Sequence, residues 1–324
     1  MCGMVQSSLF SQLASVNPAL SACLRETAEY LAAPGATRLS EQQRALALGV
    51  ARRLIGDAAD LLGGAVDSRA LWQDWGTQGI PDAERIAALC FARAEEYRWR
   101  EESAPDGGEA ADAPAEPGPE APMPDALAAD DPLAAIDRAY LALRIADRRR
   151  FDALGHPRIA LDDLDPDLLR ALLLDIAAWQ LVRTGKDAAE AALLGEAVRA
   201  ALARHRPERG IDAAARAYHA ALEAAGALPD SAAAAIARHD WPALIALAAA
   251  AHNYRYDEMA LALITAEPAQ LAPLLAPLLR DHAALAPLEG ALATLRNRAA
   301  ASAMPDDYAA ALQVRATALG DGTS

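Results

Sequence analysis

Side chains that branch at the β-carbon are scarce in this chain, and their scarcity constrains the fold more than any other feature. Valine and isoleucine together supply 18 of the 324 residues, and aromatic residues make up only 5%. Strands favour these two classes of side chain. Alanine and leucine supply most of the apolar residues instead, and both stand high on the helix-propensity scale. We therefore expect an all-α fold.

The stretch from Glu101 to Asp131 differs in composition from the rest of the chain. It contains ten acidic residues, six prolines and no basic residue. Charge repulsion and proline both favour an extended chain, and little apolar surface is available to offset the entropy of ordering it. We therefore predict a disordered acidic linker at 101–131. It would join a small N-terminal helical domain, 1–100, to a C-terminal domain, 132–320.

Helix boundaries can be recognised in the N-terminal part. Ser40 and Gln43 have the spacing of a capping box, in which each side chain accepts a hydrogen bond from the backbone of the other residue. The pair Gly63-Gly64 is expected to end the helix that begins there. Pro81 can open the last helix of this part as its first residue.

The C-terminal part repeats the same boundary signals. Asp131-Pro132 and Asp165-Pro166 each place a capping acid before a proline that can start a helix, and Glu267-Pro268 is a similar pair. A weak repeat of 28 residues matches Ile236 with Ile264 and also Leu247 with Leu275. Stacked helix pairs of this kind are typical of α-solenoids, so we predict a helical-repeat-like, HEAT-like C-terminal domain.

One segment resembles a known family. Residues 144–179 read RIADRRRFDALGHPRIALDDLDPDLLRALLLDIAAW. This string, with its arginine-rich helix end, Gly-x-Pro turn and Asp-Leu-x-x-Asp-Leu helix start, resembles a bacterial family catalogued as domain of unknown function 2336. The segments from Leu39 and from Ala220 are similar in type. The resemblance implies helical, repeat-like structure and brings no catalytic residues.

The residues that usually carry catalysis show no catalytic pattern in this sequence. The six histidines form no HExxH or other metal spacing, and the three cysteines form no CxxC pair. No GxSxG elbow, Walker loop or GxGxxG loop occurs. We therefore expect no cofactor and no metal. His219 and His252 both fall in predicted helices, which leaves phosphotransfer on a helical domain as an alternative.

The charge and the apolar runs indicate the compartment and the class of partner. A net charge of −15 and a pI near 4.8 argue against nucleic-acid binding, which needs a basic face. No uncharged apolar run approaches the roughly 20 residues that span a bilayer, and the first residues lack the pattern of a signal peptide. We expect a cytoplasmic protein without membrane insertion.

Two short segments are candidates for binding another protein. Arg148, Arg149 and Arg150 form the densest basic cluster, and arginine is enriched at interface hot spots. Tyr254 and Tyr256 lie between two predicted apolar helices, where they could line a groove. The ordinary structural interpretations are a charged helix end and tyrosines that cover helix ends.

We predict from these features that the chain is a non-enzymatic helical adaptor or scaffold that binds other proteins. The alternative is a bacterial signalling component with phosphotransfer or enzyme-regulating activity. The sequence does not indicate the partner or the oligomeric state.

Overall fold

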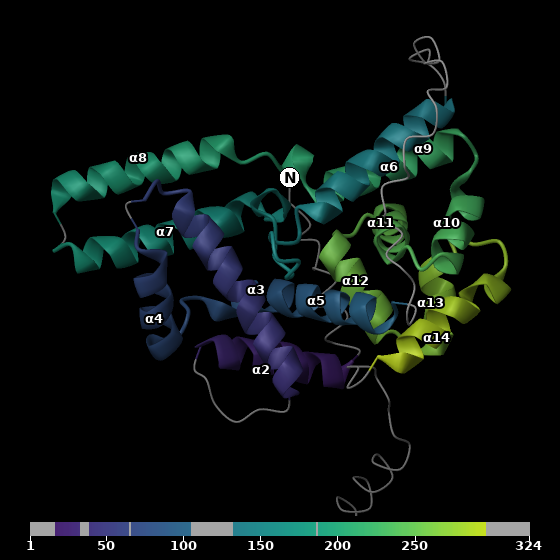
Figure 1. The fold of residues 1–324 in the computed structure, drawn as a ribbon, viewed down its shortest axis with the longest axis horizontal. Coiled ribbons are helices and arrows are strands. Elements are labelled where there is room, and N and C mark those ends of the chain that lie inside the picture. Colours follow the sequence, from purple (N-terminus) through teal and green to yellow (C-terminus); the bar gives the residue numbers. More distant parts are fainter. Residues whose placement is uncertain (1–16, 33–38, 65, 105–131, 186, 296–324) are drawn as a thin grey trace, which may run out of the picture.

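The computed structural model describes residues 17–32, 39–64, 66–104, 132–185 and 187–295, and these residues form an all-α fold (Figure 1). Apart from one isolated bridge between Phe151 and Pro157, they contain no β-structure. The expected fold class is thereby confirmed. The α-helices in chain order are α2 Pro18–Ala32, α3 Glu41–Asp60, α4 Ser68–Gln78, α5 Ala83–Glu102, α6 Pro132–Arg148, α7 Pro166–Arg183, α8 Ala188–Arg204, α9 Ile211–Ala224, α10 Leu228–Ala237, α11 Trp241–His252, α12 Tyr256–Thr265, α13 Pro268–Leu275 and α14 Ala286–Thr294.

Three short 3-10 turns complete the helical structure. They are η1 Leu161–Asp163, η2 Pro207–Arg209 and η3 His282–Leu285. Of the expected linker, Glu101 and Glu102 belong to the last turn of α5, and residues 105–131 lie outside the described part of the chain.

The helix boundaries follow the local sequence signals closely. The Ser40 hydroxyl accepts a hydrogen bond from the Gln43 amide, while the Gln43 side chain accepts one from the Ser40 amide. Asp165 caps α7 through the amides of Asp167 and Leu168. After α3 the chain turns at Gly63-Gly64, where both residues have positive φ angles that favour glycine.

The start of α5 differs from the prediction. Pro81 was expected as the first helical residue, but α5 begins at Ala83. Asp82 before it has a φ of 46°, in the left-handed region, so the chain makes a turn between the proline and the helix. A proline fixes only its own φ, and it cannot fix the conformation of the residue that follows it.

Helix α5 lies at the centre of the molecule and packs against α2, α3, α12 and α14 (Figure 1). Its apolar residues are buried, but so are four of its charged ones, Arg93, Glu95, Glu96 and Arg98. On one side Arg98 pairs with Glu95, with its Nη1 2.7 Å from Oε1. Charged residues are almost never fully buried unless they are paired, so α5 depends on partners from the surrounding helices.

The hydrophobic cores do not follow the predicted division at the linker. One core joins α2–α5 to η1, α7 and α8, and so contains residues from both sides of 105–131. A second core joins α6 and α9–α14, and it includes Trp99 from α5. Figure 1 shows α7 and α8 beside α3 and α4, away from the last helices. The parts before and after the linker are therefore packed together as one body.

The 28-residue repeat corresponds to two consecutive helix pairs, α10–α11 and α12–α13. The matched residues Ile236, Ile264, Leu247 and Leu275 are all fully buried in the same core. The repeat in sequence therefore reflects a repeated position relative to the core.

Candidate functional site at the end of helix α6

The three consecutive arginines at the end of α6 point in different directions. Successive residues of a helix are rotated by about 100°. Arg148 is exposed, Arg149 is half-buried and donates to the Arg209 carbonyl at 3.3 Å, and Arg150 is only 2% exposed. All three were candidates for binding a partner, and helix geometry allows at most two of them to reach the same surface. Arg150 is the one that is buried, because the chain turns inward as the helix ends.

Arg150 inserts between α5 and α12. Its Nη2 lies 2.8 Å from Oε2 of Glu96, and its Nη1 donates to Oε1 of the same carboxylate at 3.1 Å. Its guanidinium also lies over the ring of Tyr256, 4.5 Å from the centroid. Tyr256 is fully buried and donates its hydroxyl hydrogen to Glu96 at 3.1 Å. Tyr256 was also a candidate for binding a partner in a groove, but it lies in the interior of the protein.

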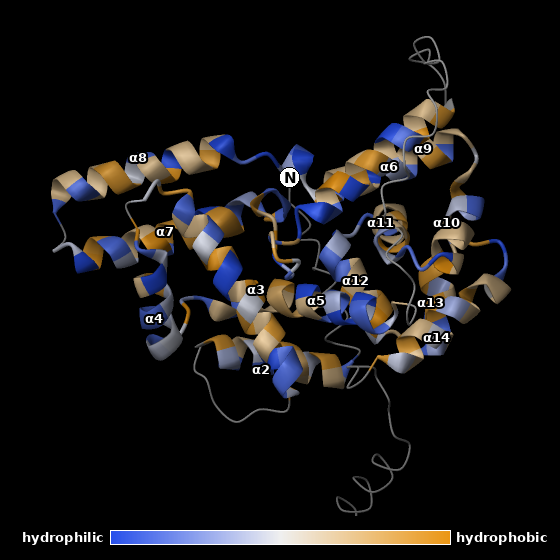
Figure 2. Ribbon diagram, viewed as in Figure 1, coloured by the Kyte–Doolittle hydropathy of each residue, from blue (hydrophilic) through white to orange (hydrophobic). Residues whose placement is uncertain are grey.

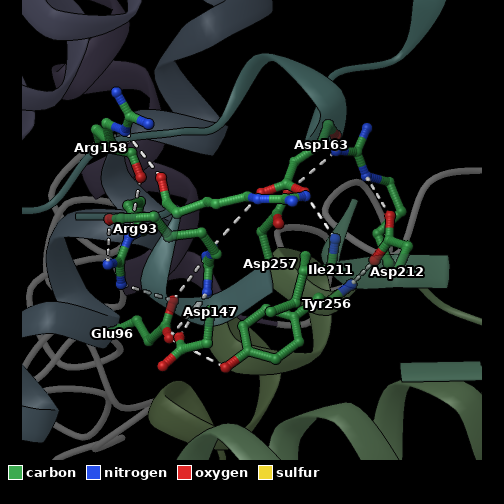
Figure 3. A network of polar contacts seen from close by, with 12 residues as sticks. Arg93, Glu96, Asp147, Arg158, Asp163, Ile211, Asp212, Tyr256 and Asp257 are labelled. Carbon is green, nitrogen blue, oxygen red and sulfur yellow. Dashed lines mark hydrogen bonds and ion pairs between the residues drawn. The ribbon is translucent and has the colours of Figure 1, made fainter. Parts of the chain in front are cut away.

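Glu96 is the centre of this buried network (Figure 3). Besides Arg150 it pairs with Arg93 at 3.1 Å and with Arg100 at 3.4 Å. Burial opposes ionisation of the carboxyl group, but the three arginines outweigh it and lower the pKa of Glu96 to about 2. Arg100 is held in turn by both oxygens of Asp147, at 2.8 and 3.0 Å. Glu96 is therefore ionised at neutral pH although it is fully buried.

Two aspartates connect this network to the starts of other helices (Figure 3). Asp163 of η1 accepts a hydrogen bond from the Ile211 amide at 2.7 Å, at the N-terminus of α9. Asp212 of α9 accepts one from the Tyr256 amide at 2.7 Å, at the N-terminus of α12. Carboxylates are favourable at helix N-termini because amide hydrogens there have no partner within the helix. Each cap comes from a residue at least 44 positions away, so these caps fix tertiary structure.

Glycine is required where η1 approaches α9. A Cβ atom placed on Gly210 would lie 2.6 Å from the Asp162 carbonyl oxygen and 2.9 Å from Oδ1 of Asp163. Any side chain at this position would push η1 away from α9 and break the Asp163 cap.

The pKa of Asp163 is expected to make stability fall as the pH rises towards neutrality. Burial is the main reason that this pKa is raised to about 7, and the charges of Asp257 and Asp212 act in the same direction, whereas Arg150 and the Ile211 amide act against it. The unfolded-state pKa is about 3.9. The stabilisation is therefore complete below about pH 4 and is lost as the pH rises through about 7.

Urea unfolding of the wild type and of Asp163→Asn, between about pH 5 and about pH 8, measures this effect. The asparagine side chain keeps an oxygen that can accept the hydrogen bond from the Ile211 backbone N–H, but it does not titrate. We expect the free energy of unfolding to fall more steeply with pH in the wild type than in the variant. Asp167→Asn, at a highly exposed position of α7, is the control. Equal slopes for wild type and Asp163→Asn would contradict the prediction.

Tyr254 lies apart from this network. It is half-buried and stacks on His252 with ring centroids 6.1 Å apart. Nε2 of His252 lies 2.7 Å from the Leu274 carbonyl oxygen and donates to it. His219, the other phosphotransfer candidate, is partly buried, with Nδ1 3.9 Å from Glu223. Both histidines therefore have structural contacts within the helical domain.

The outer side of α6 carries a surface that sequence reasoning missed. Leu133, Leu141 and Ile145 are 69%, 59% and 47% exposed. They are spaced by eight and four residues, which places them within about 120° around the helix. Arg144 and Arg148 are also exposed on this side, together with one acidic residue, Asp137. We call the three aliphatic residues and the two arginines the α6 face.

The opposite side of α6 packs against α9 and α11. Both apolar sides of α6 can be recognised in the sequence, because Leu133, Leu141 and Ile145 form a second apolar stripe beside the buried one.

No known family, curated protein or solved structure matches the chain. The resemblance to domain of unknown function 2336 is therefore still a prediction. Within the described residues, no helix has the length and apolar character needed to cross a membrane.

Proposed function

We propose that this protein is a non-enzymatic helical adaptor, and that the α6 face binds its protein partner. The exposure of large apolar side chains supports the proposal. Among the described residues, the large apolar side chains that are exposed all lie between Leu133 and Leu193, on α6, α7, α8 and one loop. Exposed apolar clusters bordered by polar residues are typical of interaction sites. Figure 2 shows hydrophobic residues along α6 and along α8 at the edge of the molecule.

The composition of the α6 face favours a partner that is both apolar and acidic. Two arginines, Arg144 and Arg148, accompany the three aliphatic side chains, and arginine binds carboxylates through two parallel hydrogen bonds. An amphipathic helix with acidic residues beside its apolar stripe would match this arrangement. We also propose that the protein is cytoplasmic and that it belongs to the family catalogued as domain of unknown function 2336.

Changing Leu141 and Ile145 to glutamate tests the proposal. A partner is first captured with the wild-type chain, identified by mass spectrometry and purified, and its affinity is then measured by calorimetry. We expect the double variant to bind about 30-fold more weakly or worse, as for loss of a hot spot of roughly 2 kcal/mol. Its melting temperature should change little, because both side chains are exposed in the free protein.

Leu193→Glu on α8 is the matched control, since Leu193 is 71% exposed on a different helix. It should leave the affinity unchanged. Arg148→Gln should weaken binding, and the loss should shrink at high salt as exposed charges become screened. Wild-type affinity in the Leu141→Glu, Ile145→Glu chain, or an equal loss in Leu193→Glu, would show that the partner binds elsewhere.

A further inference from the structure

A cleft of about 550 Å³ lies where α5 ends, beside α6 and the turn between α10 and α11. Trp241 lines it and stacks on His239, with ring centroids 4.9 Å apart. Trp241 is fixed by a hydrogen bond from its Nε1 to the Ser103 hydroxyl at 2.7 Å. The last described residue before the acidic stretch, Ala104, also lines the cleft. The cleft is thus situated at the last described residue before residues 105–131.

The charges around the cleft are mainly positive. Arg100, Arg144 and Arg238 line it, against one acid, Asp240. Arg100 is held by Asp147. Asp240 is engaged by the Tyr140 hydroxyl at 2.6 Å and caps the start of α11. Arg144 lies 3.6 Å from Asp240 with half of its side chain exposed, and Arg238 is exposed. Arg144 and Arg238 therefore present positive charge to the cleft.

Residues 105–131 have the complementary charge. They include eight acidic residues and no basic residue. The stretch starts directly after Ala104 and ends directly before α6, the helix that contributes Tyr140 and Arg144 to the cleft. A chain of 27 residues can extend over about 90 Å, so its length allows any of its acids to reach the cleft.

We propose that this basic cleft binds the chain's own acidic segment, residues 105–131, through Arg144 and Arg238. Tethering at both ends raises the effective concentration of the segment to the millimolar range, so weak individual contacts suffice. Because the contacts are between exposed charges, they weaken with salt. The inference does not depend on the proposed function, although Arg144 belongs to both surfaces.

The composition of the chain offers a direct test. Lys186 is its only lysine, so Arg238→Lys adds one amine at the cleft while keeping its positive charge. A carbodiimide then joins amines to carboxylates that are in contact, and mass spectrometry locates the links. We expect links from position 238 to acids of 105–131, several-fold more than from a control amine introduced by Arg199→Lys on α8. Arg199 is highly exposed.

Three further arms decide the result. Adding Arg144→Gln to the Arg238→Lys chain should lower the yield of these links, and so should about 1 M salt, where the screening length is about 3 Å. A mixture of isotope-labelled and unlabelled chains should give links within single chains. Equal yields from positions 238 and 199, or links mainly between chains, would overturn the proposal.

Discussion

Replacing Glu96 by alanine is expected to lower the free energy of unfolding by about 3–5 kcal/mol, the cost of leaving buried charges without their partner. Arg150 and Arg93 are both almost fully buried, and each makes an ion pair with this carboxylate. The Tyr256 hydroxyl would also lose its acceptor. Urea unfolding followed by circular dichroism measures the loss.

Two further variants test whether this loss of stability comes from buried charges that have lost their partner. Changing Glu96 to leucine and Arg150 to methionine removes one charge of each sign. It should cost less than Glu96→Ala alone, because it leaves the net charge of the buried network unchanged. Glu196→Ala on the exposed side of α8 is the control and should change stability by less than about 0.5 kcal/mol. A Glu96→Ala chain as stable as the wild type would show that the network contributes nothing to folding.

Replacing Trp99 by alanine is expected to cost a similar amount, about 3–5 kcal/mol, because it leaves a large cavity in the core. Trp99 is fully buried on α5 and stacks on Trp241 of α11, with ring centroids 4.8 Å apart. The variant removes the contact by which α5 enters the core of the last helices. Thermal and urea unfolding of the purified variant test this expectation.

Trp99→Phe should cost clearly less than the alanine change. The Nε1–H group of Trp99 is buried and has no hydrogen-bond acceptor among the described residues. Phenylalanine keeps an aromatic ring and removes this unsatisfied donor, whose burial costs about 1–3 kcal/mol. In Trp179, by contrast, Nε1 donates to Asp74 at 3.1 Å, so Trp179→Phe loses a hydrogen bond. A Trp99→Phe chain as unstable as Trp99→Ala would contradict this account.

The parts of the fold that were predicted correctly depend on residues close together in sequence. Ser40 with Gln43 and Asp165 with Pro166 identify helix starts because the cap and its partners lie within three residues. The pair Gly63-Gly64 likewise identifies the end of α3 from neighbouring residues alone. The start of α5 was misplaced because Pro81 fixes only its own φ, and the local sequence does not indicate the left-handed conformation of Asp82.

The buried network could not be predicted from local pattern. Arg150 and Tyr256 are partners of Glu96 at separations of 54 and 160 residues. Charged residues at Arg93 and Glu96 on a helix usually indicate a solvated side, and only the long-range contacts show that this side is buried. The site prediction named the arginine cluster as a whole but could not tell Arg148, which is exposed, from Arg150, which is buried.

The position of α5 has a consequence for how the protein folds during synthesis. Residues 17–104 emerge from the ribosome first, with Arg93 and Glu96 already in place but without Arg150, Asp163 or Tyr256. Domains usually fold as units in the order in which they are made. Here residues 17–104 cannot complete their interior until α12 has been translated. We therefore expect a long interval during synthesis in which the side of α5 that contacts α12 lacks its partners. We expect this stage to be the one most prone to aggregation or to require a chaperone.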